Sequence, residues 1–136
     1  MVKMSMVYEG SLRCRLKHGP SGNEILTDAP VDNHGKGEAF SPTDLLAASL
    51  GSCMLTVMGI AARKNNVVMD GTTADVEKEM IIEPIRRIGK ITVKIRMAAG
   101  IDPAQRSILE HAAHTCPVHK SIHPDVKLEI AIVYPD

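Results

Sequence analysis

Aromatic residues are nearly missing from this sequence, which contains one Phe, two Tyr and no Trp. Hydrophobic residues still make up 44% of the chain, so its core must be filled with Leu, Ile, Val, Met and Ala. A chain of 136 residues suits one domain that buries roughly two thirds of its unfolded surface. We therefore predict a single domain over residues 1–136.

Net charge is missing as well, because 16 basic residues balance 16 acidic ones, and no tract of Lys and Arg occurs. This balance removes the electrostatic attraction that nucleic acids and anionic membranes exert on basic proteins. The first nine residues, MVKMSMVYE, contain no apolar stretch as long as that of a signal peptide. We expect a cytoplasmic protein with no nucleic-acid or membrane partner.

Cysteine is scarce: Cys14, Cys53 and Cys116 are the three in the chain. An odd number of cysteines without dense spacing argues against a structural disulfide framework. Free or reactive thiols are the alternative, and the question is which thiol reacts.

The most apolar stretch of the sequence predicts a long helix from Ser41 to Lys64. Ser41 can cap it, Pro42 suits the first helical position, and Asp44 completes a capping box. Beyond Asp44 apolar residues fall on every face, which predicts a helix buried nearly all round. At about 1.5 Å per residue it would be roughly 35 Å long, so the rest of the chain has to wrap around it.

The remaining chain mixes strands and helices, which predicts an α+β fold. Residues 6–16 alternate as one long strand that pairs with residues 24–27 in a hairpin. A second antiparallel pair, two helices that begin with a capping residue and Pro, and a closing strand follow. Their predicted bounds are 73–82 and 88–97 for the pair, 103–115 and 117–122 for the helices, and 126–133 for the closing strand.

The loop before the long helix, residues 28–40, is rich in Pro, Asn and Gly. Loops of about a dozen residues in compact domains are often functional. Its His34 and Glu38 are therefore candidate site residues.

Cys116 precedes Pro117, so it is predicted to cap a short helix. Backbone N–H groups, the helix dipole and the nearby His119 and Lys120 would then lower the pKa of its thiol. The alternative is that sulfur merely fills the cap position.

Cys53 lies in the middle of the apolar helix, where burial raises the pKa of a thiol unless a cation reaches it. The candidate cations are Arg13 and Arg15, on the strand face opposite Cys14, which is predicted to be a small buried hydrophobe. The carboxylates that could orient such an arginine are Asp44, Glu38 and Glu9. Alone, Cys53 is an inert core residue, but Cys53 and Cys116 together would suit a peroxide-reducing dithiol site.

A histidine cluster offers a second interpretation. Imidazoles and a thiol within a dozen residues could hold a divalent ion, although solvated helix histidines are commoner. A zinc site is therefore the minor hypothesis. The residues concerned are His111, His114, Cys116, His119 and His123.

Two segments, SPTDLLAASLGSC at 41–53 and CPVHKS at 116–121, resemble the OsmC/Ohr family of osmotically inducible and organic hydroperoxide resistance proteins. The resemblance spans nearly the whole chain. It implies an OsmC-like α+β fold in which antiparallel sheets wrap a long central helix. It also implies an intertwined homodimer with an active site at the interface.

The same resemblance implies a cysteine-based peroxidase. Cys53 would be the thiolate that attacks a hydroperoxide, Cys116 would resolve it as a disulfide, and a thiol or dithiol would reduce both. The family activates its first thiolate with an arginine, here Arg13 or Arg15, and a glutamate at the start of the helix. That glutamate position falls on Thr43, and only the adjacent Asp44 is acidic. No metal, haem or nucleotide cofactor is implied.

We therefore expect a peroxidase that prefers organic hydroperoxides to hydrogen peroxide, because apolar walls would favour an apolar substrate. The competing hypothesis is a non-enzymatic stress or redox binding protein of the same fold, in which the missing glutamate leaves weak or no peroxidase turnover. The expected walls are Leu46, Leu50, Met54 and Val57.

Overall fold

The computed structural model describes residues 1–135, which form two compact units that divide between Leu46 and Ala47. Each unit has its own sheet of three strands. The two units are described separately below, and the single domain over residues 1–136 stays a prediction.

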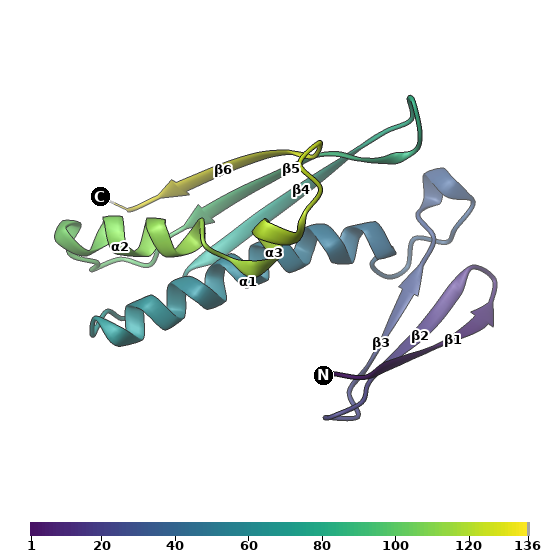
Figure 1. Ribbon diagram of the computed structural model, residues 1–136, viewed down its shortest axis with the longest axis horizontal. Coiled ribbons are helices and arrows are strands. Elements are labelled where there is room, and N and C mark those ends of the chain that lie inside the picture. The colour runs from purple at the N-terminus through teal and green to yellow at the C-terminus, as the bar shows by residue number, and fades with distance from the viewer. Residues whose placement is uncertain (136) are drawn as a thin grey trace. The chain divides into compact units, whose positions relative to one another are not determined.

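The first unit is an antiparallel sheet in the order β1-β2-β3 (Figure 1). Its strands are β1 (Met4–Gly10), β2 (Arg13–His18) and β3 (Glu24–Asp28). The loop that follows contains the short 3-10 helix η1 (Val31–Asn33) and leads to the start of helix α1 (Pro42–Lys64).

The predicted long strand over residues 6–16 is wrong, because the chain reverses within it. Gly10, Ser11 and Leu12 have φ angles of 88°, 53° and 61°, in the left-handed region. This turn pairs β1 with β2 and sets Tyr8 opposite Cys14. Polar and apolar residues keep alternating through the turn, so a sequence pattern with a period of two does not reveal that the chain reverses there. The predicted hairpin partner, β3, does pair with β2.

Helix α1 begins as its capping box predicts. The backbone N–H of Ser41 donates to Asp44 Oδ2 at 2.9 Å, and the N–H of Asp44 donates to Ser41 Oγ at 3.0 Å. Pro42 occupies the first helical position. Local sequence alone therefore determined where this helix starts.

The prediction that α1 is buried nearly all round is wrong. Its buried residues recur every three or four positions and form one stripe, while Leu46 and Ile60 are 44% and 52% exposed. A helix packed against one sheet buries only one stripe, and a uniformly apolar helix does not reveal which one. The stripe consists of Ala47, Leu50, Gly51, Met54, Met58 and Ala62. By length and composition α1 could cross a membrane, but this buried stripe makes it a core helix.

The second unit contains a mixed sheet in the order β4-β5-β6. Strand β5 pairs antiparallel with β4, as predicted, and parallel with β6. A parallel connection needs a long crossover, which here contains both remaining helices. The bounds are β4 (Thr73–Ile81), β5 (Arg87–Arg96), α2 (Pro103–Ala113), α3 (Pro117–Ser121) and β6 (Lys127–Val133).

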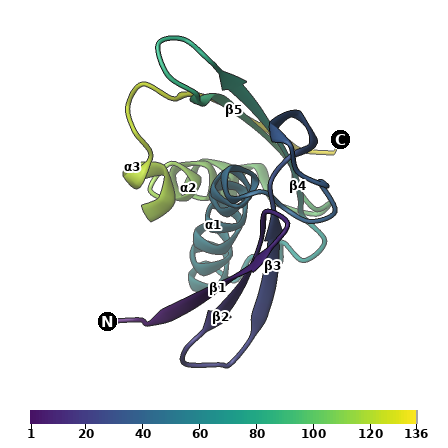
Figure 2. The same cartoon turned by 90° about the vertical axis from the view of Figure 1, so that its right-hand side faces the viewer.

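Helices α1 and α2 lie on the same face of this sheet (Figures 1 and 2). Alternate residues of β5, Ile91, Val93 and Ile95, are fully buried against them. The opposite face is charged: Arg96 pairs with Asp75, and Lys90 Nζ lies 3.4 Å from Glu79 Oε2. Acidic side chains of β4 thus pair with basic side chains of β5 on this face.

Helix α1 packs closely against β4 at Gly51. A Cβ atom added there would lie 2.7 Å from Val76 Cγ2, closer than side-chain carbons approach one another. The absence of a side chain at residue 51 therefore allows α1 to pack at this distance from the sheet.

Candidate thiol site and arginine cluster

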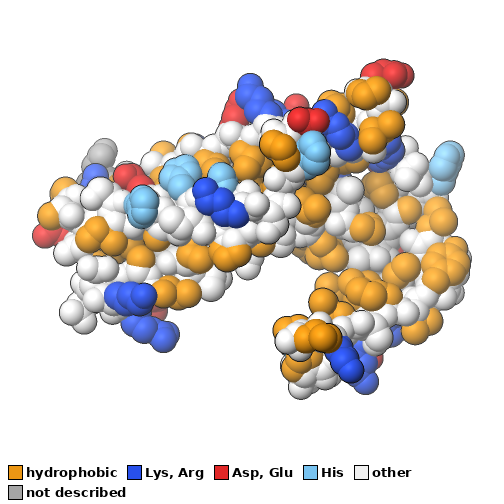
Figure 3. Space-filling view, viewed as in Figure 1, with side chains coloured by type: hydrophobic (Ala, Val, Ile, Leu, Met, Phe, Trp, Pro, Cys, Tyr) orange, Lys and Arg blue, Asp and Glu red, His pale blue; other side chains and the backbone are white. Residues whose placement is uncertain are grey.

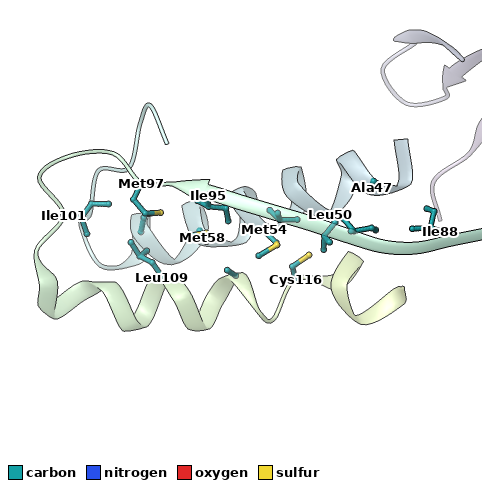
Figure 4. Packing of buried hydrophobic residues seen from close by; sticks show 14 residues of the cluster. Ala47, Leu50, Met54, Met58, Ile88, Ile95, Met97, Ile101, Leu109 and Cys116 are labelled. Atoms are coloured by element: carbon teal, nitrogen blue, oxygen red, sulfur yellow. The ribbon is translucent and has the colours of Figure 1, made fainter. Parts of the chain in front are cut away.

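The structure brings the side chains of Cys53 and Cys116 together. Cys53 lies in the middle of α1 and is partly buried, whereas Cys116 precedes α3 and is fully buried. The Cys53 side chain acts directly on the pKa of the Cys116 thiol, so the two side chains are neighbours. Figure 4 shows Cys116 in the hydrophobic cluster, beside Met54 of α1. Two thiols far apart in sequence are thus neighbours within the second unit.

Cys116 caps α3, as predicted: Pro117 is the first helical residue, and the backbone N–H of His119 donates to Cys116 Sγ at 3.3 Å. The predicted fall in its pKa is wrong, because burial raises the pKa of the Cys116 thiol above its usual value. The neighbouring Cys53 side chain raises the pKa further, and the cap N–H groups offset only part of this rise. Cys116 is therefore a protonated thiol at neutral pH.

Arg13 and Arg15 lie on β2 in the first unit and have different partners. Arg13 donates two hydrogen bonds to Asp28, from Nε to Oδ1 at 2.7 Å and from Nη2 to Oδ2 at 2.8 Å. The Nη2 atom of Arg13 also lies 3.4 Å from Glu38 Oε2. Arg15 pairs instead with Glu9 at 2.9 Å and Glu24 at 3.2 Å. Which arginine serves Cys53 stays a prediction at this point.

Asp28 is the residue that the sequence prediction missed. Its side chain is 2% exposed, and the Arg13 guanidinium holds the pKa of its carboxyl below the usual value. The sequence offered it only as the first residue of a loop. Its role depends on the register between β2 and β3, which places Arg13 directly opposite Asp28. A known register would have revealed the pair.

The other predicted carboxylates have separate roles. Asp44 Oδ2 accepts the Ser41 N–H, so this carboxylate caps α1. Thr43, at the position of the family glutamate, has its Oγ1 3.2 Å from Ser41 Oγ. Glu38 is exposed near Arg13, and its backbone N–H donates to Asp28 Oδ2 at 3.1 Å. The other loop candidate, His34, is exposed at the end of η1.

Cys14 lies apart from this chemistry. It is partly buried on β2, between Tyr8 of β1 and Thr27 of β3. The expected buried hydrophobe is therefore only half-covered within the first unit.

Histidine side chains gather over α2 and the segment after it (Figure 3). The rings of His114 and His119 meet edge to face, with centroids 6.2 Å apart. Burial, together with Lys120 and His114, lowers the pKa of His119, whose Nδ1 is buried without a hydrogen-bond partner. Within residues 1–135, no group of three or more His, Cys, Asp and Glu side chains is placed to hold a metal ion. The zinc hypothesis thus gains no support.

Only some of the residues that were expected to form apolar walls of the substrate site are exposed enough to do so. Leu50 and Met54 are fully buried in the core, so they cannot line an open substrate site, whereas Leu46 is exposed and Val57 is half-buried. A cavity of about 420 Å³ lies elsewhere, between residues 65–70 and 98–105, and none of the predicted site residues lines it.

Comparisons with known proteins place this geometry in a family. The family model described as OsmC-like protein matches residues 35–131. A comparison with curated proteins gives no match.

Solved structures with the same fold include a protein from Psychrobacter arcticus 273-4, provisionally described as an osmotic stress induced and detoxification response protein. It is 50% identical, with a TM-score of 0.91, over 98% of this chain and 96% of its own. The organic hydroperoxide resistance protein OsmC of Legionella pneumophila has 16% identity and a TM-score of 0.75, over 97% and 96% of the two chains. The organic hydroperoxide resistance protein OhrB of Bacillus subtilis has 16% identity and a TM-score of 0.69, over 98% of both chains.

The match over residues 35–131 includes both cysteines that the structure brings together. The likeness to the Psychrobacter protein extends over nearly the whole chain, including the first sheet. With its α+β architecture and these matches, the chain belongs to the OsmC-like protein family.

Proposed function

We propose that this protein is a dithiol peroxidase that reduces organic hydroperoxides. The contact between the Cys53 and Cys116 thiols is the observation that carries the proposal. Membership of a stress-related family that includes organic hydroperoxide resistance proteins supports it.

The reaction balances over two cysteines and one external reductant. The Cys53 thiolate attacks the distal oxygen of ROOH, the O–O bond breaks, and the alkoxide takes a proton to leave as ROH. Cys53 becomes a sulfenic acid. The Cys116 thiol then attacks the Cys53 sulfur, which forms a disulfide and releases water. A dithiol reductant restores both thiols and is itself oxidised to a disulfide.

Exposure assigns the two roles in this proposal. Cys53 is partly exposed, so a peroxide can reach it, whereas Cys116 is fully buried. Burial also keeps Cys116 protonated, which suits a thiol that must not react with peroxide first. Cys53 therefore attacks and Cys116 resolves.

Organic hydroperoxides are the proposed substrates because Cys53 packs against the hydrophobic cluster of the second unit. An alkyl group would bury apolar surface there, and hydrogen peroxide would not. The proposed reductant is a thiol or dithiol, as expected in a cytoplasm that keeps its thiols reduced.

We also propose that the protein works as a homodimer. On β1, Met4, Met6, Val7 and Tyr8 are between 58% and 63% exposed, and α1 leaves Leu46 and Ile60 open. Apolar surface of this extent is typical of an interface. Light scattering coupled to size-exclusion chromatography should give twice the mass of the chain, and the mass of one chain would contradict the dimer.

The test of the proposed function is a single-turnover reaction with cumene hydroperoxide without a reductant. We expect one equivalent of peroxide to consume two thiols per chain. Cys53→Ser should consume none, and Cys14→Ser, the matched control, should behave as the parent does. A parent protein that keeps all its thiols would refute the proposal.

A non-enzymatic thiol protein of the same fold is the second candidate. It is favoured by Thr43, which stands at the position of the family glutamate and has its hydroxyl beside Ser41 within the helix cap. A Thr43→Glu variant separates the two: a large rise in peroxide consumption would favour the non-enzymatic protein, and no change would favour the peroxidase.

A further inference from the structure

We propose that the thiols of Cys53 and Cys116 and the thioether of Met54 form a binding site for a soft monovalent metal ion, Cu(I). The site lies wholly within the second unit and requires only that both thiols are reduced. The inference therefore goes beyond the proposed peroxidase, and it applies equally to a non-enzymatic protein of the same fold.

Three sulfur-containing side chains meet in one part of the second unit. Cys53 and Met54 are consecutive residues in the middle of α1. The Cys53 side chain is a neighbour of the Cys116 thiol. Met54 and Cys116 belong to the same buried cluster, and Figure 4 shows one side chain extending from α1 and the other from the segment before α3 into the same region. Two thiols and one thioether are therefore available to a single ion.

The type and number of these ligands favour Cu(I). Thiolates and thioethers are soft ligands, which select Cu(I) over hard cations. Zinc also binds thiolates, but it takes at least three protein ligands from Cys, His, Asp and Glu. Within residues 1–135, no third side chain of these types joins the two thiols. Cu(I) accepts fewer ligands than zinc, and the Met54 thioether adds a soft one that zinc does not use.

Charge also favours a monovalent cation at this position. Two neighbouring thiolates in an apolar cluster would repel each other, and no basic side chain belongs to that cluster. A bound Cu(I) ion compensates this negative charge, and one proton is released to solvent for each thiol that becomes a thiolate. The backbone N–H of His119 donates to Cys116 Sγ at 3.3 Å, which stabilises negative charge on that sulfur.

Burial gives the site both shielding and a route of entry. Cys116 and Met54 are fully buried, so water does not compete for their sulfur atoms. Cys53 is only partly buried. An ion carried by a small thiol in solution therefore reaches the Cys53 sulfur first and then exchanges onto the two buried sulfur atoms.

The test titrates the reduced full chain with Cu(I) under anaerobic conditions, in competition with bicinchoninate, a coloured Cu(I) chelator. We expect one Cu(I) ion per chain, and native mass spectrometry should show the added copper and the lost protons. Cys53→Ser and Cys116→Ser should each lower the affinity by about a hundredfold or more, because each removes a metal ligand. Cys14→Ser, the matched control in the first unit, should keep the parental affinity.

The thioether is tested separately with a substitution that preserves volume. Met54→Leu removes the sulfur but fills a similar space, so the core should stay folded. We expect the affinity for Cu(I) to fall about tenfold. Met58→Leu removes another fully buried methionine, one turn further along α1, and should leave the affinity unchanged. Thermal unfolding of both variants checks that they are equally well folded.

Three results would overturn the inference: parental affinity in Cys53→Ser or Cys116→Ser, equal affinities of Met54→Leu and Met58→Leu, or displacement of Cu(I) by an equal concentration of zinc. Because binding is measured without peroxide, the two proposals fail separately. A protein that binds Cu(I) but leaves cumene hydroperoxide intact refutes the peroxidase alone. A working peroxidase that binds no Cu(I) refutes the metal site alone.

Discussion

The two units of this protein hold their reactive groups by different forces. In the first unit, a thin sheet with an exposed β1 strand holds Arg13 through one buried carboxylate, Asp28. In the second unit, dense apolar packing of α1, β5 and α2 holds the thiols of Cys53 and Cys116. The Arg13 guanidinium is therefore oriented by an ion pair, whereas the cysteine side chains are oriented by apolar packing.

This difference also explains the pKa values. Carboxylates next to Arg13 raise the pKa of its guanidinium, which stays charged. Burial raises the pKa of Cys116, which stays neutral. The proposed reaction needs the second condition: a resolving thiol that waits until a sulfenic acid has formed.

The largest difference between the two units is expected when one cysteine in each unit is replaced by serine. Cys116→Ser should reduce steady-state peroxide turnover by about a hundredfold or more, because no partner thiol can form the disulfide. The first oxidation should persist and leave a Cys53 sulfenic acid that a dimedone probe labels. Cys14→Ser, in the first unit, should keep parental turnover. Equal effects of the two substitutions would remove the distinction between the units.

Core truncation should show the next largest difference. Leu109 of α2 is fully buried, so Leu109→Ala should lower the free energy of unfolding by about 3 kcal/mol. Ile25 of β3 is 46% exposed, and Ile25→Ala should cost less than about 1 kcal/mol. Urea denaturation measures both. A larger loss at Ile25 would show that the first sheet is covered as densely as the second unit's core.

Two glycines of α1 test how closely this helix packs against the sheet of the second unit. Gly51→Ala should destabilise the protein by about 1 kcal/mol, because the contact with the stiff Val76 side chain outweighs the gain in helix propensity. Gly59, whose added Cβ would meet no atom within 4 Å, is the matched control. Gly59→Ala should stabilise by up to about 1 kcal/mol. Thermal unfolding should show shifts of opposite sign, and a stabilising Gly51→Ala would contradict the close approach.

The smallest effect concerns acid stability. The pKa of His119 is lower in the folded protein than its ordinary value, because burial disfavours the imidazolium. The unfolded chain therefore binds the proton first as the pH falls. The contribution of His119 to the free energy of unfolding is therefore fully present above a pH of about 6.5. It is lost as the pH falls through the pKa of His119 in the folded protein.

His119→Gln should accordingly lessen the fall in unfolding free energy between pH 7 and pH 5. His111→Gln, which removes an exposed histidine of α2, controls for loss of an imidazole. If both substitutions change the pH dependence equally, burial of His119 is not the cause.

Sequence reasoning succeeded where the determinants are local. The starts of α1, α2 and α3 follow from a capping residue and a proline, and all three lie where predicted. The turn at Ser11 and Leu12 was missed because alternation continues through it, and both residues adopt positive φ angles without being glycine.

The candidate site was predictable only in part, because tertiary contacts decide the rest. Both cysteines could be named from their motifs, but the raised pKa of Cys116 comes from packing that the motif does not contain. Asp28 could not be selected, because its importance depends on strand register and burial. For the same reason the buried stripe of α1 could not be chosen among equally apolar faces.

The most direct test of the central claim is disulfide mapping after one equivalent of cumene hydroperoxide. The protein is alkylated, digested under non-reducing conditions and analysed by mass spectrometry. We predict one linked pair of peptides that joins Cys53 to Cys116 and is two hydrogen atoms lighter than the reduced pair, with Cys14 alkylated. A link through Cys14, or a Cys53 that is oxidised to sulfinic acid while Cys116 stays free, would contradict the dithiol mechanism.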